Sequence, residues 1–156
     1  MNKLVENCKI VHGLAPCTPS SSTPDYVCMS NYNNLMVIIS VDNGSTVTGS
    51  AITLKQATAA DGTGEKALKF DWQWANADTA ASDTLTKTAV TSNTFTPTTT
   101  NAKNSLHIIE VRAEDLDMAN GFDWVRVGTG DAANTVVDVI YVLYNPRYST
   151  MPTAIA

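Results

Sequence analysis

The chain has 156 residues, of which 44% are hydrophobic and 16% are charged, and its formal net charge is −5. This length fits one domain that buries about 68–70% of the surface of its unfolded form, so folding requires no metal or disulfide. The ten Lys and Arg residues are scattered, whereas a nucleic-acid surface needs clustered cations. No apolar run approaches the length of about 20 residues that a membrane helix needs. We therefore expect neither a nucleic acid nor a membrane as a partner.

The N-terminal segment differs in composition from the rest of the chain. Residues 4–12 are mildly apolar and predict either an edge strand or an arm that lies on a neighbouring molecule. The proline-rich residues 16–24 predict an extended linker, because proline cannot donate a backbone hydrogen bond. Charged residues interrupt any signal-peptide core, so we expect cytoplasmic synthesis without export. The predicted organisation is an arm and linker over 1–24, a single domain over 25–148 and a C-terminal tail over 149–156.

The three cysteines, Cys8, Cys17 and Cys28, all lie in the first fifth of the chain. Their spacing matches no zinc or thioredoxin-like motif. An odd number of thiols cannot be fully paired within one chain. We expect reduced thiols in a reducing cytosol. The alternative is that one thiol cross-links subunits once an assembly meets oxidising surroundings.

The segment TLKQATAADGTGEKALKF has the glycines and lysine of a phosphate-binding loop but not their spacing. Gly62 and Gly64 are separated by one residue, and Ala67 stands where a magnesium-binding hydroxyl is required. The polar–apolar alternation on both sides and the Asp61-Gly62 pair are typical of a hairpin. The sequence therefore predicts a long β-hairpin over residues 51–75.

The second half of this hairpin carries four large apolar side chains at alternate positions, which are Leu68, Phe70, Trp72 and Trp74. Alternation places them on one face of a strand, opposite polar residues such as Gln73. The face is predicted to belong to the core, because buried aromatic residues dominate core energetics. The alternative is a platform on which sugar rings stack.

The remaining strands follow from short apolar alternations separated by turn residues. Thr-rich residues 84–100 predict an exposed meander, and residues 139–143 are apolar on both faces, as in a central strand. The other predicted strands are 26–30, 35–42, 87–91, 93–96, 106–113, 123–129 and 135–144. This pattern predicts an all-β, single-domain antiparallel β-sandwich or jelly-roll.

The acidic residues Glu114, Asp115, Asp117 and Asp123 are the main candidates for a metal site. An EF-hand loop that began at Asp115 would need glycine at Asn120 and glutamate at Arg126, so that motif is excluded. We expect a solvated turn here, with a calcium site as the alternative. No metal site is predicted.

No residues with the pattern of a catalytic centre are found. His12 and His107 have no cysteine or serine at a recognisable distance, and no nucleophile elbow is present. His107 is expected to be half-buried and hydrogen-bonded. The sequence therefore predicts a protein that is not an enzyme and has no cofactor.

Two segments together resemble a known class of proteins. The hairpin TLKQATAADGTGEKALKF and the run LDMANGFDWVRVGTGDAANTVVDVIYVLYNPRY are similar to segments of small virion structural proteins of tailed bacteriophages and prophages. The second segment combines a Leu-Asp turn, the Gly121-Phe122 pair before a strand, and the ending Pro146-Arg147-Tyr148. The resemblance covers about two-thirds of the chain, mainly residues 35–75 and 106–148.

The resemblance implies a β-sandwich on the surface of a phage capsid, made in the bacterial cytoplasm. It favours a head decoration or cement protein whose partners are the major capsid protein and two further copies of itself in a homotrimer. The alternatives are a neck, collar or tail component, and a carbohydrate-binding or adhesive sandwich with exposed tryptophans. By residue type, the candidate interface residues are Trp124, Tyr144, Arg147 and Tyr148. Cys8 and Cys17 are added as the thiols that could cross-link subunits.

Overall fold

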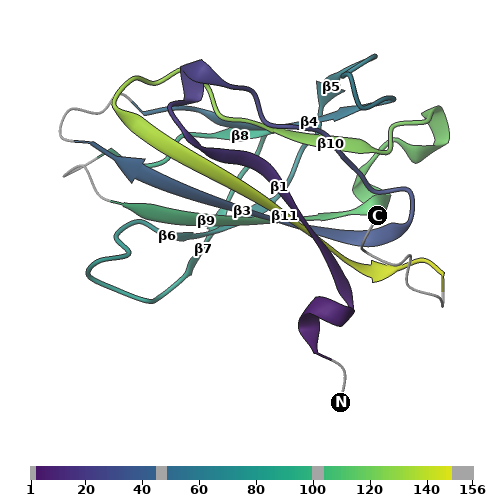
Figure 1. The fold of residues 1–156 in the computed structure, drawn as a ribbon, viewed down its shortest axis with the longest axis horizontal. Coiled ribbons are helices and arrows are strands. Elements are labelled where there is room, and N and C mark those ends of the chain that lie inside the picture. Colours follow the sequence, from purple (N-terminus) through teal and green to yellow (C-terminus); the bar gives the residue numbers. More distant parts are fainter. Residues whose placement is uncertain (1–2, 45–48, 100–103, 149–156) are drawn as a thin grey trace.

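The computed structural model describes residues 3–44, 49–99 and 104–148, and consists of two antiparallel β-sheets that pack face to face (Figure 1). Within these residues no α-helix is present, and none of the short 3₁₀ turns is long and apolar enough to cross a membrane. The 3₁₀ turns are η1 (Leu4–Glu6), η2 (Pro19–Ser21), η4 (Ala113–Asp115) and η5 (Met118–Asn120). The predicted all-β sandwich is therefore confirmed.

Sheet A is the larger layer. Its longest pairing joins its two 12-residue strands, β11 and β3, from Thr135 opposite Asn43 to Pro146 opposite Tyr32. In spatial order its strands are β1 (Cys8–Cys17), β11 (Thr135–Pro146), β3 (Tyr32–Asn43), β9 (Ser105–Arg112), β6 (Trp72–Asn76) and β7 (Thr86–Ala89).

Sheet B covers one face of sheet A and lies uppermost in Figure 1. In spatial order its strands are β2 (Val27–Cys28), β10 (Trp124–Gly128), β4 (Ile52–Ala57) and β5 (Lys66–Ala67), and β8 (Thr94–Phe95) also pairs with β4. The sequence predicted most of these strands, because each is a short alternation bounded by turn residues.

The core lies between the two sheets. Val37, Ile39 and Val139 point inward from sheet A, and Leu54 and Val127 point inward from sheet B, all fully buried. Their neighbours along each strand face outward, as the two-residue period of a strand requires. Burying each such side chain contributes about 1.5–3 kcal/mol, so these inner faces supply much of the stability.

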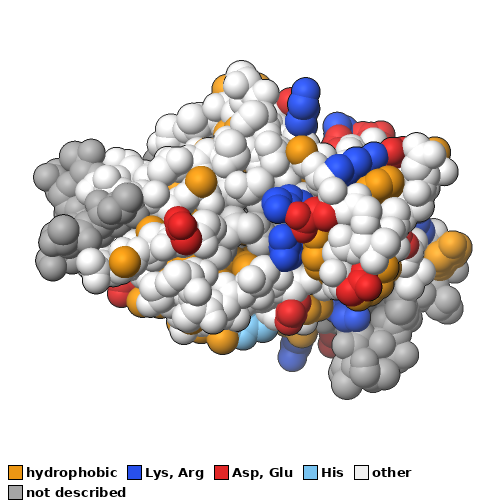
Figure 2. Space-filling model, turned by 90° about the horizontal axis from the view of Figure 1, so that it is seen from above, with side chains coloured by type: hydrophobic (Ala, Val, Ile, Leu, Met, Phe, Trp, Pro, Cys, Tyr) orange, Lys and Arg blue, Asp and Glu red, His pale blue; other side chains and the backbone are white. Residues whose placement is uncertain are grey.

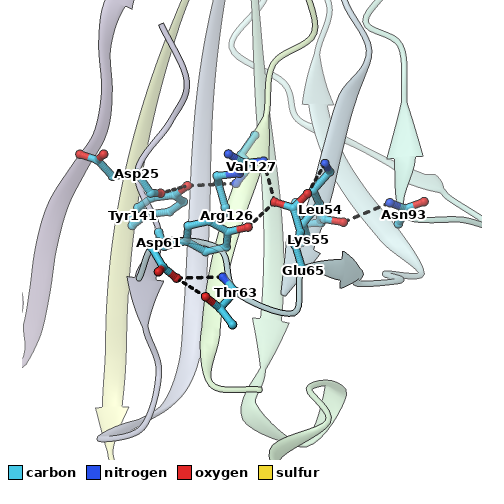
Figure 3. A network of polar contacts seen from close by, with 11 residues as sticks. Asp25, Leu54, Lys55, Asp61, Thr63, Glu65, Asn93, Arg126, Val127 and Tyr141 are labelled. Atoms are coloured by element: carbon cyan, nitrogen blue, oxygen red, sulfur yellow. Dashed lines mark hydrogen bonds and ion pairs between the residues drawn. The ribbon is translucent and has the colours of Figure 1, made fainter. Parts of the chain in front are cut away.

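Tyr141 connects the two sheets through its hydroxyl group. The side chain is fully buried, and the hydroxyl accepts a hydrogen bond from the backbone N–H of Val127 in sheet B (3.0 Å). The same hydroxyl donates to the backbone carbonyl of Asp25 (3.1 Å), so that it also holds the segment before β2 (Figure 3). Burial raises the pKa of Tyr141 far above its ordinary value. The hydroxyl therefore remains neutral and able to donate.

The N-terminal segment differs from the predicted arm and linker. Residues 8–17 form β1, an edge strand of sheet A that pairs with β11 from Cys8 opposite Tyr144 to Cys17 opposite Val137. The register shifts twice along this pairing, which is how an edge strand accommodates Gly13 and Pro16. The predicted edge strand is thus present, and it is longer than expected. The predicted tail, 149–156, lies outside the described residues.

The prediction that one face carries Leu68, Phe70, Trp72 and Trp74 into the core is wrong in its second half. Leu68 and Phe70 are buried, but Trp72 and Trp74 are 48% and 38% exposed, and Gln73 between them is buried. The chain leaves sheet B after β5 and enters sheet A at β6, and the alternation changes phase in the connection. The predicted long hairpin accordingly ends soon after β5.

Candidate functional site

The end of sheet A where β1 begins and β11 ends exposes several large apolar side chains. Leu4 and Val5 in η1 are 75% and 68% exposed, Ile10 in β1 is 55% exposed, and Tyr148 after β11 is 63% exposed. Several exposed apolar side chains at one end of a sheet are typical of a surface that binds another protein. We call this region the arm end; its residues are Leu4, Val5, Ile10, Tyr144, Arg147 and Tyr148.

Three of the predicted interface residues lie at the arm end. The Tyr144 hydroxyl donates to Glu110 of β9, on the same face of sheet A (2.9 Å). Burial and, to a smaller extent, this bond raise the pKa of Tyr144 to about 12. Arg147 donates from its backbone N–H to the Asn31 carbonyl and from Nε to the Tyr32 carbonyl, at 3.0 and 3.2 Å. The backbone after β11 is thus tied to the start of β3, and this leaves Tyr148 facing solvent.

The other three predicted interface residues do not share one surface. Cys8 pairs in register with Tyr144, but its side chain is buried, at 2% exposure. Cys17 lies at the opposite end of β1, and Trp124 lies in sheet B, where it pairs with Cys28 and Ala57. All three cysteines are free thiols. Burial excludes Cys8 from a cross-link to another subunit as long as β1 stays in place.

The two segments that carry the family resemblance meet in space. Lys66, just after the hairpin turn, forms an ion pair with Asp117 in the acidic loop, and its Nζ lies 3.7 Å from the centre of the Phe122 ring. The Gln56 side chain accepts a hydrogen bond from the backbone N–H of Asp117 (2.9 Å). We call this region the hairpin cluster; it consists of Tyr26, Lys55, Gln56, Glu65, Lys66, Asp117, Phe122 and Arg126.

Glu65 is the centre of the charged part of this cluster (Figure 3). It forms ion pairs with Lys55 (2.5 Å) and Arg126 (2.7 Å) and accepts a hydrogen bond from the Tyr26 hydroxyl. Burial opposes the ionised carboxylate, but the bonds from Lys55 and Tyr26 and the Arg126 charge together hold the pKa of Glu65 below its usual value. Burial and the bond to Glu65 in turn raise the pKa of Tyr26 to about 12. Each charged group of the cluster thus has an oppositely charged partner within it, and Glu65 is shared by two cations, which is typical of a structural network.

The turn at the tip of the hairpin is also stabilised locally, and it is not a phosphate cradle. Asp61 accepts hydrogen bonds from the backbone N–H and the hydroxyl of Thr63, at 2.9 and 2.7 Å. Gly62 and Gly64 have φ of 85° and 70°, which side-chain-bearing residues rarely adopt. The sequence prediction of a turn is confirmed.

The outer face of sheet B offers little to a ligand or partner. Figure 2 shows this face from above: it is mostly uncharged polar side chains and backbone, and its basic and acidic groups lie intermixed at the centre and over the right half of the view. Neighbouring threonines bond to each other across β4 and β8, as Thr53 and Thr94 do at 3.1 Å. This face therefore has neither an apolar patch nor a field of one sign.

The outer face of sheet A carries a groove of about 510 Å³ next to the β6–β7 edge. Trp72 and Trp74 form one wall, and Lys87 of β7 lies over both indoles, at 4.1 and 5.5 Å from the ring centres. Charged side chains of β9 and of the connection before β6, such as Glu110 and Asp71, line the rest. The groove combines exposed aromatic faces with hydrogen-bonding groups.

Residues expected to be chemically inert have structural partners. His107 is 3% exposed, more buried than expected, and its two ring nitrogens contact Ser105 Oγ (3.0 Å) and Gln73 Oε1 (3.1 Å). Burial lowers the pKa of His107 to about 4, so the ring is neutral near pH 7. The acidic loop forms two 3₁₀ turns, and among residues 3–44, 49–99 and 104–148 no group of three or more His, Cys, Asp or Glu side chains is placed to hold a metal ion.

No family model matches the chain, and no curated protein does. Among solved structures the chain is similar to the SPBc2 prophage-derived protein YomS, with 11% identity and a TM-score of 0.45, over 92% of this chain and 98% of that one.

Proposed function

We propose that this protein is a structural protein of a bacteriophage virion and that it decorates the head, where it binds across joints between capsid subunits. The observation that carries the proposal is the arm end, where four large apolar side chains are exposed: Leu4 and Val5 in η1, Ile10 in β1, and Tyr148 after β11. Exposed apolar side chains at one end of a molecule favour a surface that binds a partner. The resemblance of the hairpin and the C-terminal run to virion proteins favours the capsid as that partner.

The rest of the molecule suits such a role. The sandwich is a rigid block, and the charged groups of its hairpin cluster are paired with one another, whereas the apolar side chains of the arm end are exposed. A protein that binds only the assembled lattice stabilises that lattice by mass action. A protein that makes several weak contacts with the same capsid binds it more tightly than any one contact would allow, because of multivalency. A homotrimer on three-fold axes is the arrangement that we propose.

The experiment compares particles that contain this chain with particles from which its gene has been deleted. Deleted heads are expected to release their DNA at a lower temperature, and addition of the purified protein is expected to restore the original release temperature. A neck, collar or tail role predicts a different result: particles without the chain fail to assemble or to infect, and antibody labels one vertex or the tail. That result would replace head decoration with the alternative.

A further inference from the structure

We propose that the groove beside Trp72 and Trp74 is a binding site for neutral oligosaccharides, separate from the arm end. The site belongs to this chain alone and does not depend on whether the protein decorates a head. Three properties of the groove support this assignment: its aromatic wall, its balanced charge and its rigid frame.

The aromatic wall has the geometry that a sugar chain requires. Trp72 and Trp74 are two residues apart on β6, so both indoles project from the outer face, about 7 Å apart along the strand. Trp72 and Trp74 are 48% and 38% exposed, whereas Gln73 between them faces the core. The apolar C–H face of a pyranose ring packs on such an indole while its hydroxyls remain free to bond. Two successive indoles offer a surface for two successive rings.

The charges in the groove balance. Its acidic groups are Asp71, Glu110 and Asp115, and its basic groups are Lys69, Lys87 and Arg112. A groove with three charges of each sign gives no net attraction to an anion or a cation. It does supply planar carboxylate and guanidinium groups, which bond two neighbouring hydroxyls at once. Neutral hydroxyl-rich ligands fit this lining best.

The groove is held in shape by contacts outside the ligand space. Trp74 lies opposite Ile108 in the ladder between β6 and β9, so the backbone that carries the aromatic wall is part of sheet A. Beneath β6, Gln73 bonds to the buried His107 ring. Lys87 is the exception, since a solvent-exposed cation–π contact is weak and a sugar ring displaces it at low cost. The site is therefore largely formed before a ligand arrives.

The test titrates the purified full chain with hexasaccharides of α-1,4-glucose, β-1,4-glucose, β-1,4-N-acetylglucosamine and mannose, followed by tryptophan fluorescence and calorimetry. Saturable binding of at least one sugar is expected. Trp74→Ala is expected to weaken it by about tenfold or more, as truncation of an aromatic anchor does. Glu110→Gln is expected to weaken it while it preserves the shape of the groove. Trp124→Phe, in the other sheet, is the matched control and is expected to leave binding unchanged.

Two results would overturn the proposal. The first is no binding of any of the four sugars by a chain whose melting temperature and circular dichroism show that it is folded. The second is a change in molecular mass in solution when Trp72 or Trp74 is replaced, without sugar binding, which would make the groove a contact between copies of the chain. Neither result bears on head decoration, which is measured on particles.

Discussion

Gly13 of β1 lies directly against the ring of Tyr141 in β11, where a Cβ on residue 13 would overlap the ring. The Gly13 carbonyl accepts a hydrogen bond from the backbone N–H of Asp25 (2.8 Å), and the Tyr141 hydroxyl donates to the carbonyl of the same residue. The three residues thus join the edge strand, the central strand and the segment that leads to β2. The fit depends on the absence of a side chain at residue 13.

Replacement of this glycine is expected to destabilise the fold. Gly13→Ala forces the Tyr141 ring or β1 to move, and such overpacking costs about 1–3 kcal/mol of unfolding free energy. Gly128→Ala is the control, because a Cβ there would meet its nearest atoms at 3.7 Å, an ordinary contact. Urea denaturation of both variants measures the difference. Equal effects would show that the Gly13–Tyr141 contact is not a tight one.

The hydroxyl of Tyr141 is expected to matter more than that of Tyr144. Tyr141→Phe leaves the buried N–H of Val127 without its acceptor, which costs about 1–3 kcal/mol. In Tyr144→Phe the lost partner, Glu110, is exposed and can bond to water instead. We expect a clear fall in the denaturation midpoint for the first variant and little change for the second. The reverse order would contradict the described hydrogen bonds.

The sequence predicted the sandwich because its two-residue alternation reports directly which side chains face inward. It succeeded for residues 35–42 and 106–113, each of which keeps one phase along a single strand. It failed at Trp72 and Trp74, because the chain passes from sheet B to sheet A between Phe70 and β6. The side chains at even positions point into the core before this connection and away from it afterwards, and the sequence alternates in the same way throughout.

The sites were harder to predict than the strands. Lys66 and Asp117 meet across 51 residues, and Glu65 and Arg126 across 61, so their contacts depend on sheet order and not on local spacing. Tyr148 was selected by residue type and is exposed, whereas Cys8 was selected in the same way and is buried. The exposure of Leu4 and Val5 was missed because apolar residues at these positions fit a half-buried edge strand as well as they fit an exposed turn. The one available signal was the charged Lys3 and Glu6 beside them.

Arg126 and Arg112 both form ion pairs, but only Arg126 is expected to contribute to the stability of the fold. The Arg126 side chain is 19% exposed, pairs with Glu65 and lies over the Tyr26 ring at 5.0 Å. Arg126→Met is expected to cost about 1 kcal/mol of unfolding free energy. Arg112 is paired with Glu114 and Asp115, but its side chain is 60% exposed, so Arg112→Met is expected to leave the midpoint unchanged. Thermal unfolding of the two variants provides the measurement.

Stability is expected to fall in mild acid because of His107. Its folded pKa, about 4, lies below the unfolded value of about 6.5, so between these values the unfolded chain binds more protons. The effect of His107 on the free energy of unfolding is absent above pH 6.5. From pH 6.5 down to pH 4, protonation of His107 in the unfolded chain lowers the free energy of unfolding by about 1.4 kcal/mol per pH unit. His107→Gln is expected to flatten this part of the pH profile. An unchanged slope in that variant would assign the pH dependence to other groups.

The arm end is expected to be required for binding to heads and not for folding. A Leu4→Asp, Val5→Asp double variant changes two side chains that are 75% and 68% exposed, so its melting temperature should match that of the unaltered protein. Its binding to heads that lack this chain should be lost. Leu85→Asp, at an exposed position before β7, is the control and should bind normally. Normal binding of the double variant would place the contact elsewhere on the molecule.

The most direct test of head decoration is the copy number of this chain relative to the major capsid subunit in purified particles, by quantitative mass spectrometry. A protein that binds across joints throughout the lattice predicts a number of copies comparable to that of the capsid subunit. A ratio equivalent to one ring of subunits per particle would contradict head decoration and assign the protein to the neck or tail.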